Sequence, residues 1–102
     1  MAVEHNHLID LILNDNFIIS NHARIRMFQR NISTEYIREI IIHGEIIEEY
    51  PDDEPCPAAL FLGFPDGIPC HVVVVQCEDH ARIITVYSPE SDKWIDHRIR
   101  RK

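Results

Sequence analysis

The sequence has no apolar run long enough to cross a membrane and no apolar leader. Stretches such as Ile40–Ile42 and Val72–Val75 are far shorter than the roughly 20 residues that a membrane-spanning helix needs. Residues 1–7 are polar, and Glu4 stands where a signal peptide would carry positive charge. We therefore expect a soluble, cytoplasmic protein with no membrane partner.

Cysteine is scarce, with Cys56, Cys70 and Cys77 as its only occurrences. An odd number at irregular spacing, without a Cys-x-x-Cys pair, is a poor disulfide framework. We predict free thiols in a reducing compartment, serving as small buried apolar side chains. No grouping of the three cysteines and seven histidines matches zinc-ligand spacing. The sequence thus predicts no metal and no cofactor.

Positive charge is in the minority, because the net charge is −7, which argues against sequence-blind binding to nucleic acid. The charges are nevertheless segregated. Residues 20–34 contain three arginines and no acid, and residues 93–102 contain five basic residues and one acid, whereas six acids gather within residues 45–54. Charge runs are most often solvated surfaces, but two basic segments that meet in space would make a site for an anion.

The periodic patterns predict three helices followed by four strands. The helices are expected at 7–14, from Ser20 or Asn21 through Arg30, and from Ser33 to Gly44. The strands are expected at 45–50, 58–64, 70–77 and 81–87. Residues 17–19 are either a strand or an extended lead-in, and the chain from Pro89 is irregular, with a partly helical tail.

Short connections between consecutive strands predict a four-stranded antiparallel meander with the N-terminal helices packed on one face, an α+β fold. The length fits a single domain, 1–102, with an N-terminal helix within 1–16 and a basic tail at 93–102. Ala23, Met27 and Phe28 are expected to face inward. Gly44 is expected to end the third helix in the left-handed conformation, and the run Val72–Val75 to be covered on both faces.

His22, Arg26 and Arg30 are spaced four residues apart, so on a helix they form one stripe. An imidazole exchanges protons near neutral pH, and a guanidinium holds a phosphate through paired hydrogen bonds. The stripe therefore suits phosphate chemistry. The alternative is structural: the histidine supports the helix start while the arginines pair with the acidic strand.

His71 opens a central strand, where alternation puts it on one face with Val73 and Val75. If that face carries the basic helix, His71 adds a second acid–base group; otherwise it is a hydrogen-bonded structural residue. Tyr87, a proton donor, completes the candidate catalytic set. Four further residues are candidates for substrate binding: Arg24, Arg82, Trp94 and Arg98. Tryptophan can stack on a base, although Tyr87 and Trp94 are aromatic residues of a kind that more often simply fills the end of a core.

Several stretches carry a family resemblance: Ile19–Ala23 with Arg26-Met27 and Arg30–Ile32, then Gly44–Asp53, His71–Val73 and Ile84–Pro89. Together they resemble a bacterial domain-of-unknown-function family, number 4258, so that residues 17–102 form the family-like core. That family looks similar to the RelE-like group of small toxin ribonucleases, which share helices followed by an antiparallel meander and act without metal. The resemblance implies His22 as general base, Arg26 and Arg30 as a phosphate clamp, and His71 or Tyr87 as general acid.

The first functional hypothesis is therefore a metal-independent endoribonuclease of toxin type, with RNA as substrate. The alternative is a non-catalytic module that binds an antitoxin or another protein through the basic helix or through the edge strand at 45–50. In a third hypothesis the polar residues are purely structural.

Overall fold

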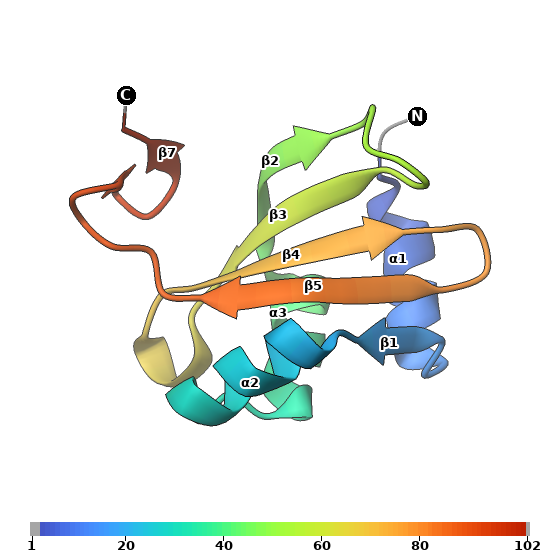
Figure 1. The fold of residues 1–102 in the computed structure, drawn as a ribbon, viewed down its shortest axis with the longest axis horizontal. Coiled ribbons are helices and arrows are strands. Elements are labelled where there is room, and N and C mark those ends of the chain that lie inside the picture. Colours follow the sequence, from blue (N-terminus) through green and yellow to red (C-terminus); the bar gives the residue numbers. More distant parts are fainter. Residues whose placement is uncertain (1–2, 102) are drawn as a thin grey trace.

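In a computed structural model that describes residues 3–101, the chain forms three α-helices and a mixed five-stranded sheet, followed by a small two-stranded hairpin (Figure 1). The helices are α1 (His5–Leu13), α2 (Asn21–Arg30) and α3 (Thr34–His43). The sheet contains β1 (Phe17–Ile19), β2 (Glu45–Tyr50), β3 (Ala58–Gly63), β4 (Cys70–Gln76) and β5 (Ala81–Tyr87). A 3₁₀ turn, η1 (Pro65–Gly67), joins β3 to β4, and the hairpin consists of β6 (Trp94–Ile95) and β7 (Ile99–Arg100). None of the helices within this range is long and apolar enough to reach across a membrane.

The antiparallel meander of β2 to β5 is confirmed, but the prediction of four strands is wrong. The sheet order is β1-β5-β4-β3-β2, and β1 lies parallel to β5, with Phe17 opposite Ala81 and Ile19 opposite Ile83. Three residues of Phe17–Ile19 are enough for a strand because β5 offers them an open edge. Since β1 ends at Ile19, the second half of β5 has no strand on its outer edge, and α2 lies along it there instead (Figure 1).

The helices cover one face of the sheet. Val72 and Val74 of β4 point into a core that includes Ile12 of α1, Met27 of α2 and Ile41 of α3. The opposite face carries His71, Val73 and Val75 by strand alternation, and it is covered only in part. On the helix side Val72 and Val74 are fully buried, whereas on the opposite face Val73 and Val75 are half-buried. The prediction that both faces are covered holds only for the start of the strand, where His71 is buried.

Serine caps begin α2 and α3 as predicted. The hydroxyl of Ser20 accepts a hydrogen bond from the N–H of Ala23 at 3.0 Å, and that of Ser33 accepts one from Tyr36 at 3.1 Å. These bonds satisfy N–H groups of the first turn that have no partner within the helix. The same Ser20 hydroxyl donates to the carbonyl of Ile84 at 2.9 Å, so the cap also fixes the start of α2 against β5.

Two local predictions are wrong. Phe28, expected inward, is 86% exposed, because Ala23 and Met27 already fill the inner side of α2 and Phe28 points outward. Gly44 is not left-handed, since its φ is −77°. It is glycine for a steric reason: a Cβ would lie 2.1 Å from the carbonyl oxygen of Ile40 and 2.7 Å from that of Leu62.

The tail is a hairpin and not partly helical. Trp94 lies opposite Arg100, and Ile95 opposite Ile99. An extended chain projects alternate side chains to the same side, which lets Arg98 and Arg100 both reach acids of β2 while Trp94 is buried. A helix would turn the two arginines away from each other.

The strand β2 forms the outer edge of the sheet, as predicted for the acidic segment. Its pairing with β3 slips between Ile46 and Glu48, which makes a β-bulge at Ile47. Past the bulge, Glu48 lies opposite Leu60 and Tyr50 opposite Ala58. Glu48 and Tyr50 therefore point to the face of the sheet that the helices leave open.

The prediction of free thiols is wrong for two of the three cysteines, because Cys56 and Cys77 form a disulfide. Ala58 lies opposite Val75, and continuing this register places Cys56 directly across from Cys77. Cys70 is a free, buried thiol as predicted, and burial raises its pKa to about 11. The bond removes the cysteine argument for a reducing compartment, and the cytoplasmic location stays a prediction.

We expect thiol titration to count the bond. The native protein should show no reactive thiol, because Cys70 is buried; unfolding without reductant should expose one thiol, and unfolding with reductant all three. The change Cys56→Ser should cost about 3 kcal/mol of unfolding free energy, since the bond closes a loop of intermediate length. Two or more reactive thiols after unfolding without reductant would contradict the pairing.

Candidate functional site

A pocket of about 310 Å³ opens between α2, the end of β5 and the tail. Its walls combine cationic, hydroxyl and aromatic side chains: Arg26, Arg30, Thr85, Tyr87, Ser88, Glu90, Lys93, Trp94 and Arg100. The arginines of α2 and the basic residues of the tail thus meet around one cavity. The sequence analysis required the two basic segments to meet in space for an anion site, and around this cavity they do.

The α2 side of the pocket supplies two cations without acidic partners. Arg30 donates from Nη1 to the Ser88 hydroxyl at 3.0 Å, and within residues 3–101 neither Arg26 nor Arg30 forms an ion pair with a carboxylate. Their expected pairing with the acidic strand is therefore absent from this part of the chain. Both guanidinium groups keep hydrogen-bond donors for an incoming anion.

His22 lies at the rim of the pocket, one turn before Arg26. Its Nε2 atom is 3.0 Å from the hydroxyl of Thr85, which lines the cavity. If Nε2 carries the proton and donates it to Thr85, Nδ1 has the lone pair and can accept a proton. The imidazole is exposed and therefore open to a molecule bound in the cavity.

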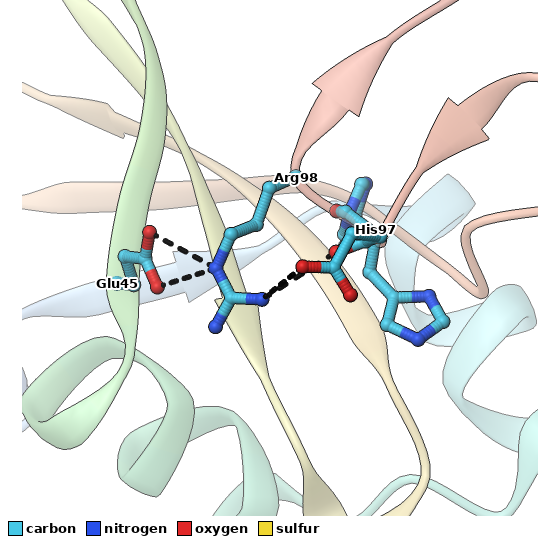
Figure 2. A network of polar contacts seen from close by, with 5 residues as sticks. Glu45, His97 and Arg98 are labelled. Atoms are coloured by element: carbon cyan, nitrogen blue, oxygen red, sulfur yellow. Dashed lines mark hydrogen bonds and ion pairs between the residues drawn. The ribbon is translucent and has the colours of Figure 1, made fainter.

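The acidic strand pairs with the tail instead of α2. The Arg98 Nε atom lies 3.0 Å from the Glu45 carboxylate, and Arg100 Nη2 lies 3.0 Å from that of Glu48. Figure 2 shows the Arg98 guanidinium reaching Glu45, with the His97 ring pointing away from the pair. These contacts hold the tail across the open face of the sheet and neutralise much of the negative charge of β2.

Arg100 of the tail lines the pocket and has two contacts that hold its guanidinium group. Its guanidinium lies 4.6 Å from the centre of the Trp94 ring and contacts Glu48. That contact with Arg100 holds the pKa of Glu48 below its usual value. Tyr50 also donates a hydrogen bond to Glu48, and burial, helped by this bond, raises the pKa of Tyr50 to about 12.

His71 does not line the pocket, because it is fully buried behind it. Its Nε2 is 2.7 Å from the His97 carbonyl and must donate, and its Nδ1 has no hydrogen-bond partner among residues 3–101. Its ring forms T-shaped contacts with the rings of Tyr87 and Trp94, at centroid distances of 5.1 Å and 4.5 Å. The face of His71 is covered by the tail and not by the basic helix, so His71 supports the pocket wall from within.

The two candidate aromatics have different settings. Tyr87 lines the cavity half-buried, and burial raises the pKa of its hydroxyl, which keeps the proton on the group. Trp94 is only 4% exposed, and Arg100 covers one of its faces. Trp94 therefore fills the wall as a core residue and has little open surface for stacking on a base.

The remaining predicted binding residues do not line this cavity. Arg24 is exposed on α2. Arg82 is five residues before Tyr87, about 16 Å along an extended strand, and Arg98 forms an ion pair with Glu45.

Several lining residues were missed by sequence reasoning: Thr85, Ser88, Glu90, Lys93 and Arg100. The sequence identified the tail as basic but could not show which of its residues line the cavity. The hairpin places Lys93 and Arg100 there. No three His, Cys, Asp or Glu side chains in the described part gather to hold a metal ion.

Buried His71 should make stability depend on pH. Burial lowers its pKa from 6.5, so the unfolded chain binds the proton first as pH falls. The stability present above pH 6.5 is then lost as pH falls from 6.5 toward the lower folded pKa. We expect a lower urea midpoint at about pH 5 than at about pH 7.5, and a smaller difference in His71→Gln. An equal pH dependence in His71→Gln would contradict this origin.

Comparison with known families gives one match. The model of the family described as Domain of unknown function (DUF4258) matches residues 19–88. Searches among curated proteins and among solved structures found no match. The matched segment holds α2 and β5 with their side of the pocket, while Lys93, Trp94 and Arg100 follow it. The RelE-like relationship stays a prediction.

Proposed function

Because the chain belongs to the DUF4258 family, whose description gives no activity, we propose a function from the pocket: metal-independent cleavage of RNA, as in a small ribonuclease toxin. One observation carries the proposal. Arg26 and Arg30 face Lys93 and Arg100 around a single cavity, and the two guanidinium groups of α2 have no carboxylate partner within residues 3–101. Such a cluster attracts a phosphate diester even though the whole chain carries a charge of −7.

The arginines bind the scissile phosphate and stabilise its transition state. The Ser88 hydroxyl, 3.0 Å from the guanidinium group of Arg30, and the ring of Trp94 under that of Arg100 fix these two guanidinium groups before substrate arrives. Groups fixed in advance need no reorganisation when negative charge grows on the phosphate oxygens, which makes them more effective than mobile cations.

Proton transfer is assigned to His22 and Tyr87. The 2′-hydroxyl attacks the adjacent phosphorus and gives its proton to the neutral imidazole of His22, while the bond from phosphorus to the 5′-oxygen breaks. Tyr87, which lines the cavity half-buried and like any tyrosine is protonated at neutral pH, donates its proton to the leaving 5′-oxygen. The products are a 2′,3′-cyclic phosphate and a 5′-hydroxyl, and water returns the two groups to their starting protonation states.

His71 is a positioning residue in this proposal and not a second acid. It touches the rings of Tyr87 and Trp94 and holds the His97 carbonyl, so it joins the end of β5 to the tail. Its loss would move the tyrosine hydroxyl relative to the phosphate without removing a proton donor.

We expect purified protein to cut single-stranded RNA in the presence of a chelator. His22→Ala should lower the rate by about a hundredfold or more, because the base is lost. Arg26→Ala and Arg30→Ala should each lower it by about a hundredfold, because charge stabilisation is lost. Mass spectrometry of the cut ends should show the cyclic phosphate.

Arg101→Ala is the matched control. It removes one positive charge from the tail, but Arg101 donates to the Ser91 carbonyl and does not line the cavity. Its rate should equal that of the unaltered protein. Cleavage that is equally fast in His22→Ala would show that the activity is a contaminant or uses another mechanism.

A second candidate function is binding of a partner protein through the outer face of α2. Phe28 is 86% exposed and Ile25 57% exposed, and they lie one turn apart on a helix that contains Arg24 and no acid. Exposed apolar surface beside uncompensated positive charge fits a segment that is apolar and acidic, as expected for an antitoxin or another protein.

A labelled peptide of alternating leucine and glutamate tests this surface by fluorescence anisotropy. Phe28→Ser should weaken binding by about tenfold, because an aromatic side chain is no longer buried by the partner. Phe64→Ser removes another exposed aromatic, 48% exposed, outside α2 and should have no effect. If both variants bind like the unaltered protein, the α2 face is not the docking site.

A further inference from the structure

A second cavity, of about 230 Å³, adjoins the basic pocket. Both cavities are lined by Arg30 and Ser88, whose hydrogen bond of 3.0 Å forms the ridge between them. A ligand held by Arg30 can therefore reach into the second cavity.

The second cavity has a different chemistry from the first. Its walls are mainly apolar, aromatic and proline side chains with one amide and one carboxylate: Asn31, Ile32, Tyr36, Pro65, Asp66, Ile68 and Pro69. Ile68 is 62% exposed, so apolar surface faces the opening. Apolar walls with a few polar groups suit an unpaired nucleobase, which protein sites bind through contacts with its faces and hydrogen bonds to its edges.

Asp66 is the acceptor in this cavity, and its position is fixed. The Tyr36 hydroxyl donates to its Oδ2 at 2.6 Å, and this bond raises the pKa of Tyr36. Oδ1 of Asp66 has no hydrogen-bond partner within residues 3–101. Asp66 has φ 54° in the η1 turn, a left-handed conformation that aspartate tolerates better than most residues.

We propose that this cavity is a guanine subsite next to the scissile phosphate, with Asp66 as the residue that selects the base. The proposal rests on the ribonuclease function above and adds its substrate class: single-stranded RNA that contains guanine. The base must be unpaired because the carboxylate recognises the edge that a duplex would occupy.

Hydrogen-bond chemistry selects guanine. Its Watson–Crick edge presents two adjacent donors, N1–H and N2–H, to a carboxylate that only accepts. Adenine and cytosine each pair one donor with an acceptor on that edge, and uracil has a single N–H between two carbonyl groups. An acceptor that faces Asp66 would be repelled, which penalises these three bases. The amide of Asn31, exposed beside the cavity, can donate to guanine O6.

The test titrates the intact protein, in chelator, with inorganic phosphate and with the four nucleoside 3′-monophosphates by calorimetry. Guanosine monophosphate should bind about tenfold more tightly than uridine monophosphate, since charged hydrogen bonds discriminate on this scale. Asp66→Asn should lose this preference and leave phosphate binding unchanged, because the amide can still accept from Tyr36 but presents a donor where guanine presents donors.

Asp52→Asn is the matched control, because it removes one carboxylate from the exposed loop before β3 and should retain the preference. If all four nucleotides bind alike, and Asp66→Asn binds them as the unaltered protein does, the guanine subsite is wrong while the phosphate pocket stands. If neither phosphate nor any nucleotide binds, the proposed function and the subsite are both wrong.

Discussion

The pocket depends on one constraint, the attachment of the tail to the open face of the sheet. Trp94 is buried. The guanidinium group of Arg100 lies over the Trp94 ring and also forms an ion pair with the carboxylate of Glu48, on the edge strand β2. Because the Glu48 carboxylate is partly buried, salt screens this ion pair less than it screens a fully exposed one. Without this attachment, the walls on the α2 side would face open solvent and the cavity would be lost.

Much of the fold could be read from the sequence, because its elements have strong local signals. The caps at Ser20 and Ser33 and the apolar period of α3 act within a few residues of each other. The errors concern partners that are distant in sequence. β1 forms because β5 has an open edge to pair with. The disulfide between Cys56 and Cys77 follows from the register of β3 against β4, which cannot be deduced from the spacing of cysteines in the sequence.

The site was predictable as a stripe but not as a pocket. Spacing alone put His22, Arg26 and Arg30 on one side of a helix, and the structure places that stripe at or near the cavity. Spacing could not decide which basic residues the acidic strand would neutralise. The acidic strand β2 neutralises Arg98 and Arg100. The tail crosses the face of the sheet to which Glu45 and Glu48 point, whereas α2 lies along the opposite edge.

The bulge in β2 has a consequence for behaviour at high protein concentration. An edge strand with a regular row of unpaired backbone groups invites a second molecule to extend the sheet, which leads to aggregation. The slip between Ile46 and Glu48 breaks that row, and glutamates repel an identical edge. At the other edge, three-residue β1 and the helix beside it leave little backbone to extend. Edge-to-edge association of identical molecules is thereby disfavoured at both edges of the sheet.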